Sequence, residues 1–147
     1  MGIIRPITIG DVNACAQLLL DAYNCEPWSN RWTMEKARRY LTEFVNAERF
    51  TGFLMEEDGR AVAAAFCHSR TWWTGDELYV DEFYVATDMQ KKGLGGRLMA
   101  AVTQAVRDQG LNGVTLLTDR RFPAMEFYTR QGFEEAGNVV FLYRVVE

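Results

Sequence analysis

The chain has 147 residues, of which 48% are hydrophobic and 24% charged, and its formal net charge is −4. This length predicts one domain with a core that needs no metal or disulfide, and the acidic balance argues against a nucleic-acid-binding domain, which normally carries a clustered basic surface. The three cysteines are scattered and suggest neither a disulfide framework nor a metal site. No signal sequence precedes Ile3, and no apolar run approaches the about 20 residues of a membrane span. We therefore expect a cytoplasmic protein that binds no metal and does not enter a membrane.

The first third of the chain predicts one strand and two helices. "IIRPIT", residues 3–8, is typical of a short strand, and Asp11 is expected to cap a helix that ends near Tyr23. Residues 24–32 form a loop rich in aromatic side chains. Thr33 is placed to cap a second helix with its apolar side chains on one face.

The middle of the chain predicts a hairpin, a strand and a third helix. Residues 49–73 read as a β-hairpin with Asp58-Gly59 in the turn, and residues 76–86 as a further strand. The following helix has a regular apolar stripe and ends at Gly110. The stripe consists of Leu94, Leu98, Ala101, Val102 and Ala105.

The last third predicts a buried strand, a helix and a return to strand. "GVTLLT", residues 113–118, is nearly all apolar, as expected of a strand buried on both faces. Pro123 is expected to open a helix that Gly132 closes, and residues 133–146 to form one or two final strands. The order β-α-α-β-β-β-α-β-α-β, without a linker, predicts an α/β fold with a mixed sheet in a single domain, residues 1–147.

Residues 90–96 bring three glycines into the start of a predicted helix. The lysines precede the glycines and no Ser or Thr follows, so the P-loop pattern is not met, and Leu98 stands at the third glycine position of a dinucleotide-binding pattern. Two interpretations therefore remain, a plain turn or a phosphate site at the helix N-terminus, where four N–H groups lack intrahelical partners.

Three motifs in order resemble the GNAT superfamily of N-acetyltransferases. "VATDMQKKGLGGRLM" is similar to the acyl-coenzyme A loop of that superfamily, V-x-x-x-x-[QR]-x-x-G-x-[GA], at Val85, Gln90, Gly93 and Gly95. "FPAMEFYTRQGF" is similar to its A-x-x-x-Y-x-x-x-G-F segment, and "IIRPITIGDV" to its usual opening R-P-x-x-x-x-D. The resemblance covers the chain from about Ile3 to its end.

The resemblance implies an α+β, GNAT-like fold, with a mixed, mostly antiparallel sheet, about four flanking helices and a splayed parallel strand pair at the cofactor site. It also implies that acetyl-coenzyme A is bound as co-substrate by the strand before the loop and by the loop itself. These residues are Phe83, Tyr84, Val85, Gln90, Lys91, Lys92, Gly93, Leu94, Gly95, Gly96 and Arg97. Arg121 replaces an Asn common in the family and could reach the cofactor phosphates instead.

The implied reaction is direct transfer of the acetyl group to a primary amine. An alkylammonium must lose its proton first, which calls for a base or a desolvated site. "YVDEFYV" is similar to a segment of the diamine acetyltransferases and puts Asp81 at the position of the proposed base. Glu82 would point to the opposite face of a regular strand, and a bulge could reverse the choice. The resemblance makes Tyr128 the acid that protonates the leaving thiolate; a plain core aromatic is the alternative.

The remaining candidates concern the acceptor amine. Aromatic side chains near carboxylates would suit a cationic amine, and four tryptophans lie in or beside predicted loops: Trp28, Trp32, Trp72 and Trp73. The lone histidine, His68, is expected to be structural or solvent-facing. The alternative function is a catalytically silent acyl-coenzyme A sensor or dimerisation module, and a homodimer is possible for either function.

Overall fold

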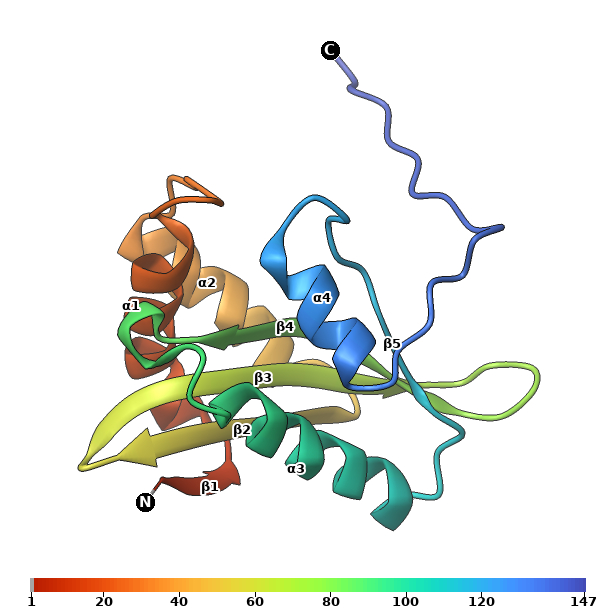
Figure 1. Ribbon diagram of the computed structural model, residues 1–147, viewed down its shortest axis with the longest axis horizontal. Helices are drawn as coiled ribbons and strands as arrows, with labels where there is room; N and C mark the ends of the chain where they lie inside the picture. The colour runs from red at the N-terminus through yellow and green to blue at the C-terminus, as the bar shows by residue number, and fades with distance from the viewer. Residues whose placement is uncertain (1) are drawn as a thin grey trace. The chain divides into compact units, whose positions relative to one another are not determined.

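The computed structural model describes residues 2–147, which fall into two compact units, Met1–Leu117 and Thr118–Glu147. The first unit holds a five-stranded sheet in the order β1-β2-β3-β4-β5 (Figure 1). Its strands are β1 (Ile3–Pro6), β2 (Phe50–Glu57), β3 (Arg60–Arg70), β4 (Glu77–Val85) and β5 (Val114–Leu116). All neighbouring pairs are antiparallel except β4 with β5, so the predicted mixed, mostly antiparallel sheet is confirmed.

The β2–β3 hairpin forms where the sequence predicts it. Asp58 and Gly59 both have positive φ, 51° and 75°. Two successive residues with positive φ produce the turn whose twist matches that of the flanking strands. Asp and Gly are among the residues that adopt this conformation most readily, which is why a short dipeptide signal located the turn correctly.

β4 contains a bulge at the point where its pairing with β5 ends. Its register against β3 shifts between Val80 and Glu82, so Asp81 is an extra residue without a partner on β3. The parallel ladder with β5 is also confined to Leu78–Val80. Beyond Val80, β4 therefore runs on without a β5 partner, and this is the splayed parallel pair that the sequence led us to expect.

Helices cover both faces of the sheet in the first unit. The 3-10 turn η1 (Ile9–Asp11) leads into α1 (Val12–Tyr23), and α2 (Met34–Val45) follows, with the Thr33 hydroxyl accepting from the Lys36 amide as predicted. Phe66 of β3 packs against Phe44 of α2. Ser69, which has the opposite parity on β3, bonds Gln109 at the end of α3 (Leu94–Asp108). Alternation along a strand thus puts α1 and α2 on one face and α3 on the other.

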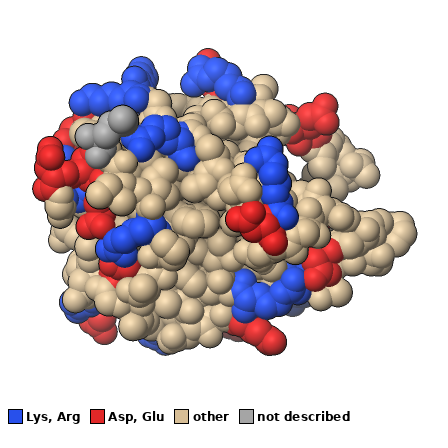
Figure 2. Space-filling view, turned by 90° about the horizontal axis from the view of Figure 1, so that it is seen from below, with Lys and Arg blue, Asp and Glu red and all other residues tan. Residues whose placement is uncertain are grey.

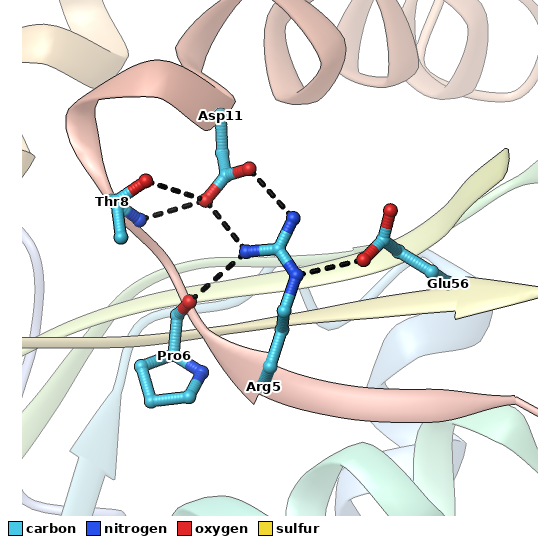
Figure 3. A network of polar contacts seen from close by, with 5 residues as sticks. All are labelled: Arg5, Pro6, Thr8, Asp11 and Glu56. Atoms are coloured by element: carbon cyan, nitrogen blue, oxygen red, sulfur yellow. Dashed lines mark hydrogen bonds and ion pairs between the residues drawn. The ribbon is translucent and has the colours of Figure 1, made fainter. Parts of the chain in front are cut away.

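A polar network joins the first strand, the first helix and β2 (Figure 3). The Arg5 guanidinium donates to both Asp11 oxygens at 2.8 and 2.9 Å and to Glu56 at 2.7 Å. Asp11 also accepts from the amide and hydroxyl of Thr8. The Arg and Asp of the opening motif therefore tie the end of β1 to the start of α1. Asp11 stands at the predicted N-cap of α1 but its side chain caps the preceding turn instead.

Two predictions about the later elements are wrong. The three residues of β5 are half-buried, whereas burial on both faces was expected, because β5 is the edge strand of the five-stranded sheet. In the second unit, α4 (Pro123–Arg130) begins at Pro123 and ends before Gly132 as predicted, but residues 131–147 contain no strand. Seven apolar side chains between Val139 and Val146 are 65 to 83% exposed. Their pattern suits a strand, and a strand forms only where a second strand supplies backbone partners.

None of the helices in the described residues is long and apolar enough to cross a membrane.

Candidate active site

The glycine loop ends in a left-handed cap at the start of α3. After β4 the chain makes the 3-10 turn η2 (Thr87–Met89). Lys91 and Gly93 then have positive φ, 62° and 82°, and Gly93 is the N-cap of α3 without a side-chain cap. The amides of Gly93, Leu94, Gly95 and Gly96 are the four that a helix start leaves without intrahelical partners. The last two, Gly95 and Gly96, carry no side chain of their own that could cover this positive end of the helix dipole.

The side chains of the loop divide into those that shape it and those that remain exposed. Gln90 Nε2 donates to the carbonyl of Val85 at 3.1 Å and so ties the loop to the end of β4. Arg97 Nη2 donates to the carbonyl of Gly2 at 2.8 Å. Lys91 and Lys92 are exposed beside the helix start and supply positive potential there. Figure 2 shows Lys and Arg side chains in several groups on one face of the molecule, with Asp and Glu side chains between some of them.

In the last residues of β4, before the loop, buried or half-buried side chains leave mainly the backbone to contact a ligand. The Tyr84 side chain is buried, and its hydroxyl donates to the Cys15 carbonyl at 2.8 Å. Its contribution to a ligand is therefore limited to its main chain. The Phe83 carbonyl accepts from the Tyr23 hydroxyl at 3.3 Å, and the Val85 carbonyl from Gln90.

The bulge turns both candidate carboxylates to the face covered by α1 and α2. Asp81 Oδ2 lies 2.7 Å from His68 Nδ1 on β3. Glu82 Oε2 accepts from the Tyr40 hydroxyl of α2 at 2.5 Å. In a regular strand two consecutive side chains would lie on opposite faces. The extra residue in β4 removes that alternation, so the sequence-based contrast between Asp81 and Glu82 does not hold.

Burial changes the acidity of this cluster. It raises the pKa of Glu82 to about 6, against the opposing effect of the hydrogen bond from Tyr40. It also raises the pKa of Asp81, where the hydrogen bond from His68 acts in the other direction. Burial and the Glu82 charge together raise the pKa of the Tyr40 hydroxyl. Both carboxyl groups therefore hold a proton more strongly than in water, as a base working near neutral pH requires.

Two of the four predicted tryptophans lie at this cluster. The Trp32 ring lies 4.9 Å from the Tyr40 ring, and the Trp28 ring meets Tyr23 edge-on at 5.4 Å. Trp72 and Trp73 are on the loop between β3 and β4, with 52% and 85% of their surface exposed. The structure therefore does not bring Trp72 and Trp73 together with the other pair.

Tyr128 and Arg121 belong to the second unit. The Tyr128 ring contacts those of Phe127 and Phe133 edge-on, at 5.3 and 5.5 Å. The Arg121 guanidinium is paired with Asp119 at 2.6 and 2.9 Å, and this pairing lowers the Asp119 pKa to about 2. Arg121 would have to exchange this partner to bind a phosphate.

Sequence reasoning missed three side chains of the cluster. The sequence pattern indicated only that Tyr23 and Tyr40 lie on the apolar faces of their helices. Their hydroxyl groups find partners on β4 because both helices cross that strand, which the pattern does not indicate. His68 was expected to be structural or solvent-facing, but it is paired with Asp81 and its side chain is 32% exposed. Its spacing to Asp81 carries no signal, because the pairing follows from strand register and the bulge.

Within residues 2–147 no group of three His, Cys, Asp or Glu side chains is arranged to hold a metal ion. The absence of a metal cofactor stays a prediction.

The comparisons with known proteins agree with this architecture. A model of the Acetyltransferase (GNAT) family matches residues 14–133. No curated protein sequence matches the chain at a significant level. A possible acetyltransferase from Clostridium difficile 630 is 17% identical with a TM-score of 0.82, over 100% of this chain and 99% of that chain.

Two further solved structures carry more specific descriptions. AAC(6')-Iy, in complex with the bisubstrate analog CoA-S-monomethyl-acetylneamine, is 18% identical with a TM-score of 0.78, over 99% of both chains. The aminoglycoside acetyltransferase meta-AAC0020 from an uncultured soil metagenomic sample, in complex with sisomicin, is 18% identical with a TM-score of 0.77, over 99% of this chain and 97% of that chain. Identities this low show a shared fold, and the family model covers most of the sequence: the chain belongs to the Acetyltransferase (GNAT) family and is an acyltransferase.

Proposed function

We propose that residues 1–147 act as one domain that transfers the acetyl group of acetyl-coenzyme A to a primary amine, by direct attack in a ternary complex. The acceptor is a small-molecule or peptide amine. The observation that carries the proposal is the arrangement at the end of β4, where a strand without a β5 partner beyond Val80 leads into a helix start with four available amides.

The residues at this place fit a coenzyme A thioester. The first-turn amides from Gly93 to Gly96, with Lys91 and Lys92 beside them, would hold the pyrophosphate. The backbone of residues 83–85 would bind the pantetheine arm. Gln90 would keep the loop against Val85. When bound, acetyl-coenzyme A supplies an activated acetyl thioester.

The carboxylate cluster fits the requirement of the acceptor. Keeping an alkylammonium of pKa near 10.4 neutral at pH 7 costs about 4.6 kcal/mol. Asp81 and Glu82 lie on one face of β4, and burial raises the pKa of both. Trp28 and Trp32 border the same cluster and would receive a cationic amine on their ring faces.

Tyr128 is the proposed proton donor to the leaving thiolate. A thiol of pKa near 8.5 leaves more easily when it is protonated, and a phenol of pKa near 10 can donate that proton. The aminoglycoside acetyltransferases among the similar structures support a small polyamine as the first acceptor to try. A homodimer stays a prediction.

The experiment is thiol release from acetyl-coenzyme A across a panel of amines. The panel contains polyamines, aminoglycosides, amino acids, peptide N-termini and lysine peptides, and mass spectrometry confirms each acetylated product. We expect turnover with at least one class that carries several positive charges. Binding of acetyl-coenzyme A without turnover of any amine would contradict the proposal and favour a catalytically silent sensor.

A further inference from the structure

The imidazole of His68 is the most accessible proton-accepting group of the carboxylate cluster. Its side chain is 32% exposed, against 12% for Asp81. Glu82 is half-buried and already accepts a hydrogen bond from the Tyr40 hydroxyl. The His68 ring is therefore more open to an amine from solvent than the Asp81 carboxylate is.

The pairing with Asp81 determines which nitrogen of His68 can accept a proton. A carboxylate has only acceptor sites. Since Asp81 Oδ2 lies 2.7 Å from Nδ1, the ring must donate Nδ1–H to it. In neutral imidazole the lone pair then resides on Nε2. None of residues 2–147 provides a hydrogen-bond partner for that Nε2.

The charged and titratable groups around the ring come from three elements. On β4, the Tyr79 ring lies 5.6 Å from the imidazole. Arg70 of β3 covers the Tyr79 ring at 4.9 Å and pairs with Glu77 of β4 at 2.9 Å. From α2, Tyr40 directs its hydroxyl to Glu82. The neighbouring β2 residue in register is Phe50, which is apolar. With Arg70 paired to Glu77, the carboxylate that contacts the imidazole is that of Asp81.

We propose that His68 is the proton acceptor for the amine and that Asp81 is the residue that positions it. This inference rests on the proposed function. The alkylammonium N–H bond breaks, its electron pair stays on the amine nitrogen, and the proton forms an Nε2–H bond on His68. The Asp81 carboxylate offsets the imidazolium charge, and the exposed edge of the ring returns the proton to water. Asp81 is then not the base that the sequence resemblance suggested.

The first test observes the ring itself and needs no turnover. The chain has one histidine, so 15N-labelled histidine gives a single, unambiguous imidazole signal. We expect the neutral ring in the wild-type protein to carry its proton on Nδ1. In Asp81→Asn the amide can donate to Nδ1, so the proton should move to Nε2. Glu82→Gln should leave the tautomer unchanged. An Nε2–H tautomer in the wild-type protein would overturn the proposal.

The second test uses an amine that the wild-type protein acetylates. We expect His68→Gln, whose amide can still donate to Asp81, to lower kcat on the order of 100-fold at pH 7 while the KM for acetyl-coenzyme A stays within about twofold. The pH–rate profile of the variant should also differ from that of the wild type, because the proton acceptor has been removed.

The outcomes separate this inference from the proposed function. If His68→Gln turns over within threefold of the wild-type rate and keeps the profile, the inference is overturned and the acetyltransferase proposal stands. If the wild-type protein acetylates no amine, the proposed function fails and the proton-acceptor role fails with it.

Discussion

Replacing Glu82 by Gln should make the protein more stable at neutral pH, and the gain should disappear in acid. Burial raises the Glu82 pKa from 4.5 to about 6. Between these two values the folded chain binds more protons than the unfolded chain, so the free energy of unfolding falls as pH rises. This rise in the Glu82 pKa corresponds to about 2 kcal/mol once both states are ionised. Most of that difference develops between pH 4.5 and pH 7.5.

The assay is urea denaturation of wild type and Glu82→Gln at these two pH values. The Gln oxygen can still accept from Tyr40, and any change in that hydrogen bond affects both measurements equally. The stability of the variant relative to wild type should therefore rise by on the order of 2 kcal/mol from pH 4.5 to pH 7.5. Glu43→Gln, at an exposed position on the same helix as Tyr40, is the matched control. An equal difference at both pH values would refute the reasoning that Glu82 is destabilised by burial.

Three further predictions concern other parts of the chain. Tyr128→Phe removes only a hydroxyl, so turnover should fall on the order of 100-fold with coenzyme A affinity unchanged, and a near wild-type rate in the folded variant would exclude Tyr128 as the proton donor. The Arg5 pairing lowers the Asp11 pKa to about 2, so its stabilisation is present above about pH 4 and is lost as pH falls through 2. Asp11→Asn should thus lower the melting temperature at pH 7 by clearly more than at pH 3, and equal losses would contradict this account. Trp32→Leu should raise the KM for the amine, whereas Trp73→Leu on the exposed loop should not; equal effects would argue against the Tyr40 cluster as the acceptor site.

Local signals in the sequence predicted most of the fold. The Asp58-Gly59 turn, the Thr33 cap and the Pro123 helix start each depend on a few consecutive residues, and each was confirmed. The strand expected after Gly132 was wrong because a strand depends on a neighbour that the pattern cannot specify. β5 was expected to be buried because its composition is apolar, whereas its exposure depends on its place at the sheet edge.

The candidate site was predictable where it consists of backbone. The glycines and Gln90 form a contiguous motif, and the structure shows why Gln90 is there, since it bonds the Val85 carbonyl. The acid–base cluster was predictable only in part. A single extra residue in β4 brings Asp81 to His68 and Glu82 to Tyr40. The alternation of polar and apolar residues along β4 does not indicate where that extra residue lies.

Coenzyme A binding to two matched glycine variants tests the central claim most directly. Gly93 and Gly110 both have left-handed conformations, with φ of 82° and 67°, and an added Cβ meets nothing within 4 Å at either. They stand at opposite ends of α3. Valine at either position should therefore strain the backbone similarly and lower the melting temperature by similar amounts.

Isothermal titration of acetyl-coenzyme A into wild type, Gly93→Val and Gly110→Val gives the decisive comparison. If the α3 start binds the pyrophosphate through its amides, Gly93→Val should weaken binding on the order of tenfold or more, and Gly110→Val should stay within about twofold of wild type. If a folded Gly93→Val protein bound acetyl-coenzyme A as tightly as wild type, the loop would be only a turn without a role in binding, and the account would be contradicted.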